Sequence, residues 1–206
     1  MSYTGFLEYF TQKDLDFMIK PFEFYFDFAS PYTFIAHKKI RRIEKENSIK
    51  IIYMPILLGG LLKAAEIKAN IDIPIKGKYM VKDCKLLAEK YNIEFHFNSY
   101  FPIITLNLMR CVLVAEKKGI TQDFINNFFD AIWTNGLNVN ENTIVEKLLN
   151  NLNIDPTNFL AEANQPNIKD ELRKRTDNAH KKGIFGTPSF IVNNKLFWGQ
   201  DRLEFV

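Results

Sequence analysis

The chain has 206 residues, enough for one domain with a full core or for a domain with an insertion. It is 47% hydrophobic and 25% charged, an ordinary composition for a water-soluble globular protein. The net charge is only +3 and the charged residues of both signs are interspersed, which argues against a nucleic-acid or acidic partner.

The first 21 residues are amphipathic. Glu8, Asp14 and Asp16 interrupt their apolar side chains, so no apolar stretch is long enough for a secretory signal or a membrane span. We expect an N-terminal extension at 1–21, in which a short amphipathic helix packs on the body of the protein or on a second subunit.

The stretch 22–36 reads F-E-F-Y-F-D-F-A-S-P-Y-T-F-I-A. Its aromatic-rich part, 22–28, predicts a buried strand, and Pro31 predicts a helix start because an N–H has no intrahelical partner at that position. Ser30 is a preferred N-cap residue. It should therefore lie between a strand and a helix, where open α/β sheets bind ligands. From this stretch alone, a helix cap without any other role is the alternative for Ser30.

A β-α-β unit is predicted next. The helix continues to about Glu46, and the β-branched and aromatic residues 49–54 predict a second strand, parallel to the first. Between 55 and 183 apolar residues recur at helical spacing and indicate core packing. We expect helices at 56–68, 76–91, 105–117, 124–133, 144–152, from 156 onward, and at 166–182.

Strand patterns return at the C-terminal end. Residues 188–192 and 195–198 predict two strands, joined by a turn at Asn193 and Asn194, and Asp201 should begin a last helix. The chain then divides into the extension at 1–21, a strand-containing part at 22–56 and 184–206, and an inserted helical part at 57–183.

Cysteine and histidine are too scattered for a metal or redox motif. Cys84 and Cys111 are far apart, which favours reduced thiols in a cytoplasmic protein. His37, His96 and His180 have no partners at ligand spacing, so we expect no metal site.

Five motifs follow one another along the chain. They are F-Y-F-D-F-A-S-P-Y-T at 24–33, P-I-L-L-G-G at 55–60, K-G-K-Y-M at 76–80, G-I-F-G-T-P at 183–188 and F-W-G-Q-D-R at 197–202. In this order they resemble the family of 2-hydroxychromene-2-carboxylate isomerases and kappa-class glutathione transferases. The resemblance implies an α/β, thioredoxin-like fold of the DsbA-like branch, with β-α-β and β-β-α units around an inserted all-helical domain. The Trp at position 198 resembles the isomerases, since the transferases more often carry Phe at this position.

The turn before the first helix reads Ser30-Pro31-Tyr32-Thr33, where thioredoxin-like redox proteins carry Cys-x-x-Cys. Without a sulfur at either end it cannot shuttle a disulfide, which excludes a disulfide oxidoreductase. The helix N-terminus still offers N–H groups and a partial positive charge that favour a thiolate. The resemblance implies that this thiolate belongs to glutathione, that the Ser30 hydroxyl stabilises it, and that glutathione acts as a cofactor that is not consumed.

The resemblance assigns further glutathione-binding residues by position. Thr187-Pro188 matches a dipeptide with a cis proline, whose preceding backbone pairs with glutathione; a trans proline that starts a strand is the alternative. Gln200 and Asp201 match the pair that binds the γ-glutamyl end. For Asp201 the alternative is the N-cap of the last helix, and both roles are compatible.

Other positions match less completely. Lys76 matches a basic residue near the glycyl carboxylate, and a solvated surface lysine is its alternative. Tyr32 and Trp198 are candidates for the substrate pocket. The relatives carry Asn nine residues before the lysine, where this chain has Ile67, with Asn70 nearby, so a polar contact is lost or shifted.

Two further departures concern the pocket and the C-terminal end. Phe101-Pro102 is followed by Ile103 and Ile104 where the relatives often have Asn, which predicts a more apolar substrate pocket. The relatives have a full final helix whereas this chain ends at Val206, so we expect a sheet face that is poorly covered or covered by a partner.

The resemblance favours a glutathione-dependent cis-trans isomerase of aromatic-compound catabolism that acts on a small molecule, in the cytoplasm and as a homodimer. A kappa-class-like glutathione transferase and a non-catalytic glutathione-binding relative are the alternatives. A serine hydrolase is disfavoured because no G-x-S-x-G elbow is present. His37 also lies about 10 Å along the helix from Ser30, too far to take its proton.

Overall fold

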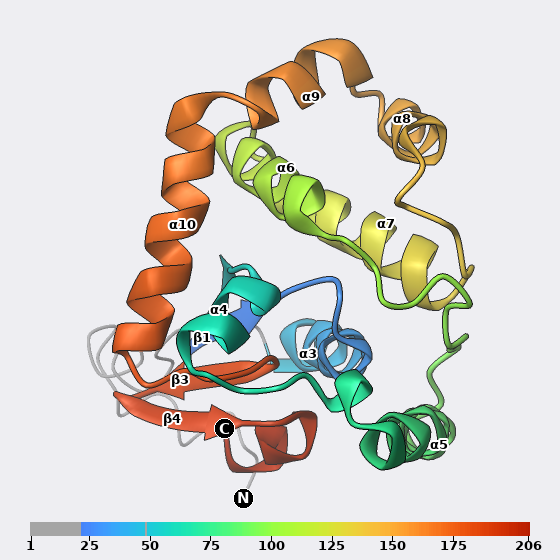
Figure 1. Cartoon of the computed structure of the whole chain (residues 1–206), viewed down its shortest axis with the longest axis vertical. Coiled ribbons are helices and arrows are strands. Elements are labelled where there is room, and N and C mark those ends of the chain that lie inside the picture. Colours follow the sequence, from blue (N-terminus) through green and yellow to red (C-terminus); the bar gives the residue numbers. More distant parts are fainter. Residues whose placement is uncertain (1–21, 48) are drawn as a thin grey trace, which may run out of the picture.

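The computed structural model describes residues 22–47 and 49–206, so the predicted N-terminal extension lies outside the described residues. Four strands form one mixed sheet in the order β2-β1-β3-β4 (Figure 1). β1 (Phe22–Phe26) pairs in parallel with β2 (Ile51–Pro55) and antiparallel with β3 (Ser189–Val192), which pairs antiparallel with β4 (Lys195–Trp198). This order confirms the predicted thioredoxin-like arrangement of a β-α-β and a β-β-α unit.

Helices account for most of the chain between β2 and β3. α3 joins β1 to β2, and each predicted helical segment corresponds to an observed helix. The helices are α3 (Pro31–Asn47), α4 (Leu58–Ala64), α5 (Pro74–Lys90), α6 (Leu106–Lys117), α7 (Thr121–Trp133), α8 (Asn142–Asn151), α9 (Pro156–Ala163) and α10 (Pro166–Lys181), with the 3₁₀ helix η1 at Asn70–Asp72. Within residues 22–47 and 49–206, no helix is both long and apolar enough to cross a membrane.

The C-terminal segment differs from the prediction. The expected helix from Asp201 is a short 3₁₀ helix, η2 (Gln200–Phe205), a form that helical segments of a few residues commonly take. Its N-cap is Gly199, which has a φ of 106° and no side-chain cap, so the predicted N-cap role of Asp201 is wrong.

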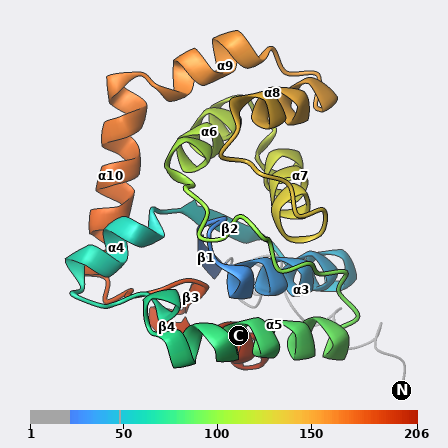
Figure 2. The ribbon, with the colours of Figure 1, turned by 45° about the vertical axis from the view of Figure 1, so that its right-hand side comes forward.

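One aromatic core joins the sheet to the helices. α6, α7, α8 and α9 lie together at one end of the molecule, and α10 runs from them back to β3 (Figures 1 and 2). The rings of Phe26 and Phe28 pack on Phe129 of α7, with centroid distances of 6.0 and 4.8 Å. The indole N–H of Trp133 donates to the Phe28 carbonyl at 2.8 Å. The helical part therefore fixes the backbone that leads into Ser30.

His37 is fully buried on the side of α3 that faces α7. Its Nε2 lies 2.9 Å from Asn126 Oδ1, its Nδ1 lies 3.1 Å from the Tyr53 hydroxyl, and its ring stacks on Phe129 at 4.8 Å. Both ring nitrogens are thus engaged away from Ser30, which agrees with the argument against a hydrolase. Burial, together with nearby positive charges, lowers the pKa of His37 to about 3.

This histidine predicts a loss of stability in acid. Between about pH 6.5 and 4 the unfolded chain binds a proton at His37 while the folded chain does not, so the free energy of unfolding falls as the pH falls. The loss should approach about 1.4 kcal/mol per pH unit. Urea unfolding at several pH values should show a smaller slope for His37→Gln than for wild type, whereas the exposed His180→Gln should keep the wild-type slope. Equal slopes for all three chains would contradict this role of His37.

Candidate active site

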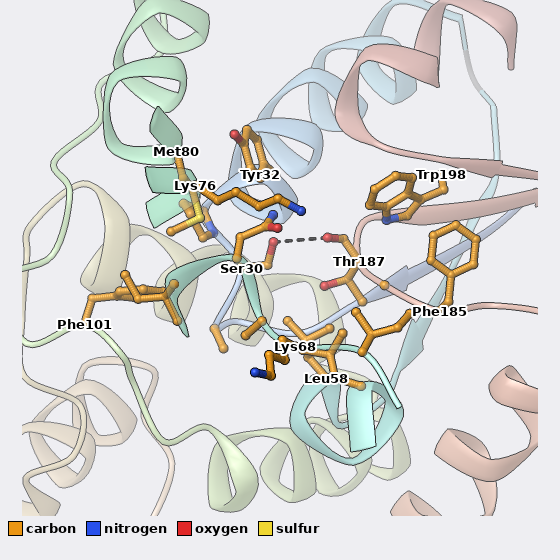
Figure 3. A pocket seen from close by; sticks show the side chains of 18 residues that line it. Ser30, Tyr32, Leu58, Lys68, Lys76, Met80, Phe101, Phe185, Thr187 and Trp198 are labelled. Atoms are coloured by element: carbon orange, nitrogen blue, oxygen red, sulfur yellow. Dashed lines mark hydrogen bonds between the residues drawn. The ribbon is translucent and has the colours of Figure 1, made fainter. Parts of the chain in front are cut away.

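Ser30 lies where β1 has ended and α3 begins. Its Oγ accepts a hydrogen bond from the Thr33 N–H at 3.2 Å, which confirms the predicted helix cap. The same hydroxyl donates to the Thr187 carbonyl at 3.2 Å. Ser30 is only 6% exposed, yet it lines a cavity of about 350 Å³ (Figure 3). Ser30 therefore caps α3 and also lines the cavity.

The cavity lies between the Ser30 turn, α4, the segment that leads through η1 into α5, and the loop before β3. Apolar side chains form most of its wall: Leu58, Leu62, Ile67, Ile71, Met80, Phe101, Phe185 and Trp198. Polar side chains are fewer: Ser30, Tyr32, Lys68, Asn70, Lys76 and Thr187. An apolar cavity of this volume with a few polar groups is typical of small-molecule sites.

The loop before β3 contributes Thr187 to the wall. The Thr187–Pro188 peptide bond is cis, as predicted, and Pro188 itself does not line the cavity. β3 begins only at Ser189, so the polar backbone groups of Thr187 lie outside the sheet ladder. The carbonyl among them accepts the hydrogen bond from the Ser30 hydroxyl.

The other predicted pair, Gln200 and Asp201, lies outside the cavity wall. Gln200 is buried, its Oε1 has no partner among the described residues, and its carbonyl accepts from Lys39 Nζ at 3.4 Å. Asp201 is exposed and forms an ion pair with Arg202 at 2.7 Å. Their assignment to the γ-glutamyl end of glutathione stays a prediction.

Tyr32 and Lys76 both line the cavity. The Tyr32 hydroxyl donates to Asp83 Oδ2 at 2.8 Å, which ties the start of α3 to α5. Burial and the neighbouring Asp83 raise the pKa of Tyr32, so it stays protonated and shapes the wall. Lys76 is exposed in the first turn of α5, and Figure 3 shows its ammonium reaching between Tyr32, Ser30 and Trp198. It is therefore placed to attract a carboxylate at the cavity mouth.

Trp198, a predicted substrate-pocket residue, lines the cavity together with Phe185, which the sequence analysis did not assign. The rings of Phe185 and Trp198 lie 4.9 Å apart, and Trp198 is 50% exposed. Trp198 packs so closely on Gly186 that a Cβ there would lie 2.7 Å from the indole nitrogen. Phe185 belongs to the motif G-I-F-G-T-P, and this was the sequence feature that could have indicated its position near the site.

Of the residues that depart from the family pattern, some line the cavity and others do not. Ile67 and Asn70 both line the cavity, so an amide is available close to the position where the relatives carry Asn. Ile103 is buried in the core and Ile104 is 76% exposed, so neither residue contributes to the apolar wall of the cavity. Phe101 supplies the apolar surface in this region instead.

Asp27 precedes the Ser30 turn, its carbonyl accepts the Ser30 N–H at 3.2 Å, and its side chain is fully buried. Its carboxylate accepts from the Ala29 N–H at 3.0 Å, the Leu58 N–H at 2.7 Å and the Thr105 hydroxyl at 2.6 Å. Burial raises the pKa of Asp27, and these three donors oppose the rise. The carboxylate therefore connects the Ser30 turn to the starts of α4 and α6. The predicted strand 22–28 also contains Glu23, so the sequence pattern did not single out Asp27.

The two cysteines lie outside the cavity wall, and both are buried. Burial raises the pKa of the Cys84 thiol, and raises the pKa of Cys111 to about 12. At neutral pH both thiols therefore stay protonated, and neither lies in the wall beside Ser30. No group of three or more His, Cys, Asp or Glu that could hold a metal ion occurs in the described part of the chain.

This protection of the thiols is open to a direct test. In the native protein at pH 7.5 we expect neither Cys84 nor Cys111 to react with a disulfide reagent such as dithionitrobenzoate on the timescale of minutes. In denaturing urea both thiols should react, which provides the control. Stoichiometric labelling of the native chain would contradict the inert role of these residues.

Comparisons with known proteins agree with this geometry. A family model described as DSBA-like thioredoxin domain matches residues 22–206. The 2-hydroxychromene-2-carboxylate isomerase of Sphingobium xenophagum is 27% identical over 191 residues, which cover 92% of this chain and 97% of that protein. Glutathione S-transferase kappa 1 of Rattus norvegicus is 24% identical over 196 residues, which cover 88% and 87%. A solved structure of a 2-hydroxychromene-2-carboxylate isomerase shares the fold, with a TM-score of 0.83 at 21% identity over 90% of this chain and 92% of that one.

Proposed function

Because the chain belongs to the DsbA-like thioredoxin family and is similar to isomerases and kappa transferases over most of its length, we propose that it is a glutathione-dependent cis-trans isomerase. One observation carries the proposal. The Ser30 hydroxyl lies at the N-terminus of α3 in a cavity wall, where redox relatives carry a cysteine and where this chain supplies no thiol. In this proposal Ser30 is the catalytic residue that stabilises the glutathione thiolate.

The cavity has features that fit this tripeptide. Thr187 offers backbone groups outside the sheet ladder, Ser30 offers a hydroxyl at a helix N-terminus, and Lys76 offers a positive charge at the mouth. Bound glutathione would supply a thiolate that adds to an electron-poor double bond and leaves again, which allows that bond to rotate.

The residues of the chain have distinct roles in this proposal. Ser30 turns its hydroxyl from the Thr187 carbonyl to the sulfur, and the released carbonyl can accept an N–H of the ligand. The α3 dipole favours the anion at the same place. The apolar wall keeps water away, which strengthens these polar interactions. Phe185 and Trp198 offer ring faces to a planar substrate.

The finer parts of the proposal rest on the family resemblance. We propose a conjugated acid of the 2-hydroxychromene type as substrate, in the breakdown of aromatic compounds. We also propose that the protein acts in the cytoplasm as a homodimer. Gln200 and Asp201 are proposed to meet the γ-glutamyl end of glutathione, and Lys76 its glycyl carboxylate.

The activity can be tested with the substrate of the named relatives. The interconversion of 2-hydroxychromene-2-carboxylate and its ring-opened trans isomer should be followed by absorbance, with and without glutathione. We expect acceleration only when both protein and glutathione are present, with all the glutathione recovered unchanged. An unchanged rate in the presence of millimolar glutathione would overturn the isomerase proposal.

A glutathione transferase is the second candidate, favoured by the kappa-class relatives and by the apolar cavity wall. The test uses chlorodinitrobenzene as electrophile. A transferase consumes one glutathione for each product formed, whereas an isomerase returns it. Binding of glutathione without turnover of either substrate would instead indicate a non-catalytic relative.

A further inference from the structure

We propose that the side-chain hydroxyl of Thr187 is a second hydrogen-bond donor to the sulfur that Ser30 holds. The inference rests on the proposed function and deepens it, since the resemblance assigns only the backbone of Thr187. In this inference the hydroxyls of Ser30 and Thr187, which are far apart in the sequence, both donate to the bound sulfur.

The first observation is an unpartnered hydroxyl. Thr187 is 8% exposed, and its Oγ1 is buried with no hydrogen-bond partner among the described residues. A buried polar atom without a partner costs free energy, and native proteins rarely leave one unless water or a ligand satisfies it.

The second observation is where this hydroxyl lies. Of the five buried side-chain atoms without a partner in the described chain, only Thr187 Oγ1 belongs to a residue that lines the cavity. The carbonyl of the same residue accepts the Ser30 hydroxyl at 3.2 Å. Figure 3 shows both oxygens of Thr187 on the side of the residue that faces Ser30. A ligand atom that contacts Ser30 therefore comes within reach of Thr187.

The third step is chemical. A thiolate accepts several hydrogen bonds, and bonds to a charged acceptor are stronger than those between neutral groups. Each donor that favours the anion lowers the pKa of the bound thiol. A valine at 187 keeps the shape of the wall but offers a methyl group to the sulfur, whereas a serine keeps the hydroxyl.

The test compares two ligands. Glutathione can form a thiolate, whereas S-methylglutathione cannot. By calorimetry at pH 7.5, Thr187→Val should bind glutathione about tenfold more weakly than wild type and S-methylglutathione within about twofold of wild type. The pKa of the bound thiol, followed by thiolate absorbance, should rise by about one unit, which corresponds to the tenfold change. Thr187→Ser should keep the wild-type values for both ligands.

Several outcomes would overturn the inference. Equal weakening of both ligands would show a structural role, and unchanged binding of glutathione would show that the hydroxyl does not meet the sulfur. Thr33→Val, which removes another buried hydroxyl without a partner, controls for folding. A fall in melting temperature for Thr187→Val but not for Thr33→Val would also mark a structural role. If wild type binds no glutathione, the proposed function itself fails, so the two failures are distinguishable.

Discussion

Replacing Ser30 by alanine should lower kcat/KM for the glutathione-dependent reaction by a factor of about 100 to 1000, the usual effect of removing one donor to a developing or bound anion. The Ser30 hydroxyl lies at the start of α3 and now donates to the Thr187 carbonyl. In the proposed complex it donates to the bound sulfur instead. The pKa of bound glutathione should rise in Ser30→Ala, because the anion loses a hydrogen bond. Thiolate absorbance measured against pH reports this rise, since burial raises the pKa of both cysteines and keeps them silent at neutral pH.

The substitution also removes a helix cap, which by itself costs about 1 kcal/mol of stability. Asp155→Ala provides the matched control, because Asp155 caps α9 through the Thr157 N–H at 3.0 Å and does not line the cavity. It should lose comparable stability and keep the wild-type activity. A thiolate that forms with the same pKa in Ser30→Ala as in wild type would remove Ser30 from the proposed role.

Replacing Asp27 by alanine should lower the free energy of unfolding by about 3 to 5 kcal/mol, one of the larger effects expected of a single change. The substitution leaves the Ala29 and Leu58 N–H groups and the Thr105 hydroxyl without their acceptor. These groups belong to the Ser30 turn and to the starts of α4 and α6, so the cavity wall should loosen together with the fold.

Urea unfolding measures this loss. Asp27→Asn keeps one acceptor oxygen and should lose roughly half as much stability. Its new NH₂ group is a donor and cannot accept the hydrogen bonds that the second carboxylate oxygen accepted. The exposed Asp177→Ala, also a loss of one carboxylate, should stay within about 0.5 kcal/mol of wild type. An Asp27→Ala protein as stable as wild type would show that the three hydrogen bonds contribute nothing net to stability.

The fold was predictable because the hydrophobic pattern of each segment matches the strand or helix that the segment forms. The aromatic run at 22–28 and the β-branched run at 49–54 correspond to β1 and β2, and the helical stripes correspond to α4–α10. β1 nevertheless ends at Phe26, two residues earlier than predicted. Asp27 leaves the strand pattern because its side chain binds backbone N–H groups beyond the strand, which no local pattern reveals.

The site was predictable only in part. The Ser-Pro step between strand and helix identified Ser30, and the family resemblance of the Thr-Pro step before the β3–β4 hairpin identified Thr187. The Ser30 hydroxyl and the Thr187 carbonyl meet at 3.2 Å. The partners of Asp27 and the place of Phe185 depend on segments brought together by the tertiary fold. Gln200 does not line the cavity because its short 3₁₀ helix lies beyond β4.

A crystal structure of the wild-type protein grown with millimolar glutathione tests the central claim most directly. We predict density for glutathione in the cavity, with its sulfur within hydrogen-bonding distance of Ser30 Oγ and its peptide paired with the backbone of Thr187. A cavity that stays free of glutathione, or a bound tripeptide whose sulfur points away from Ser30, would contradict the claim.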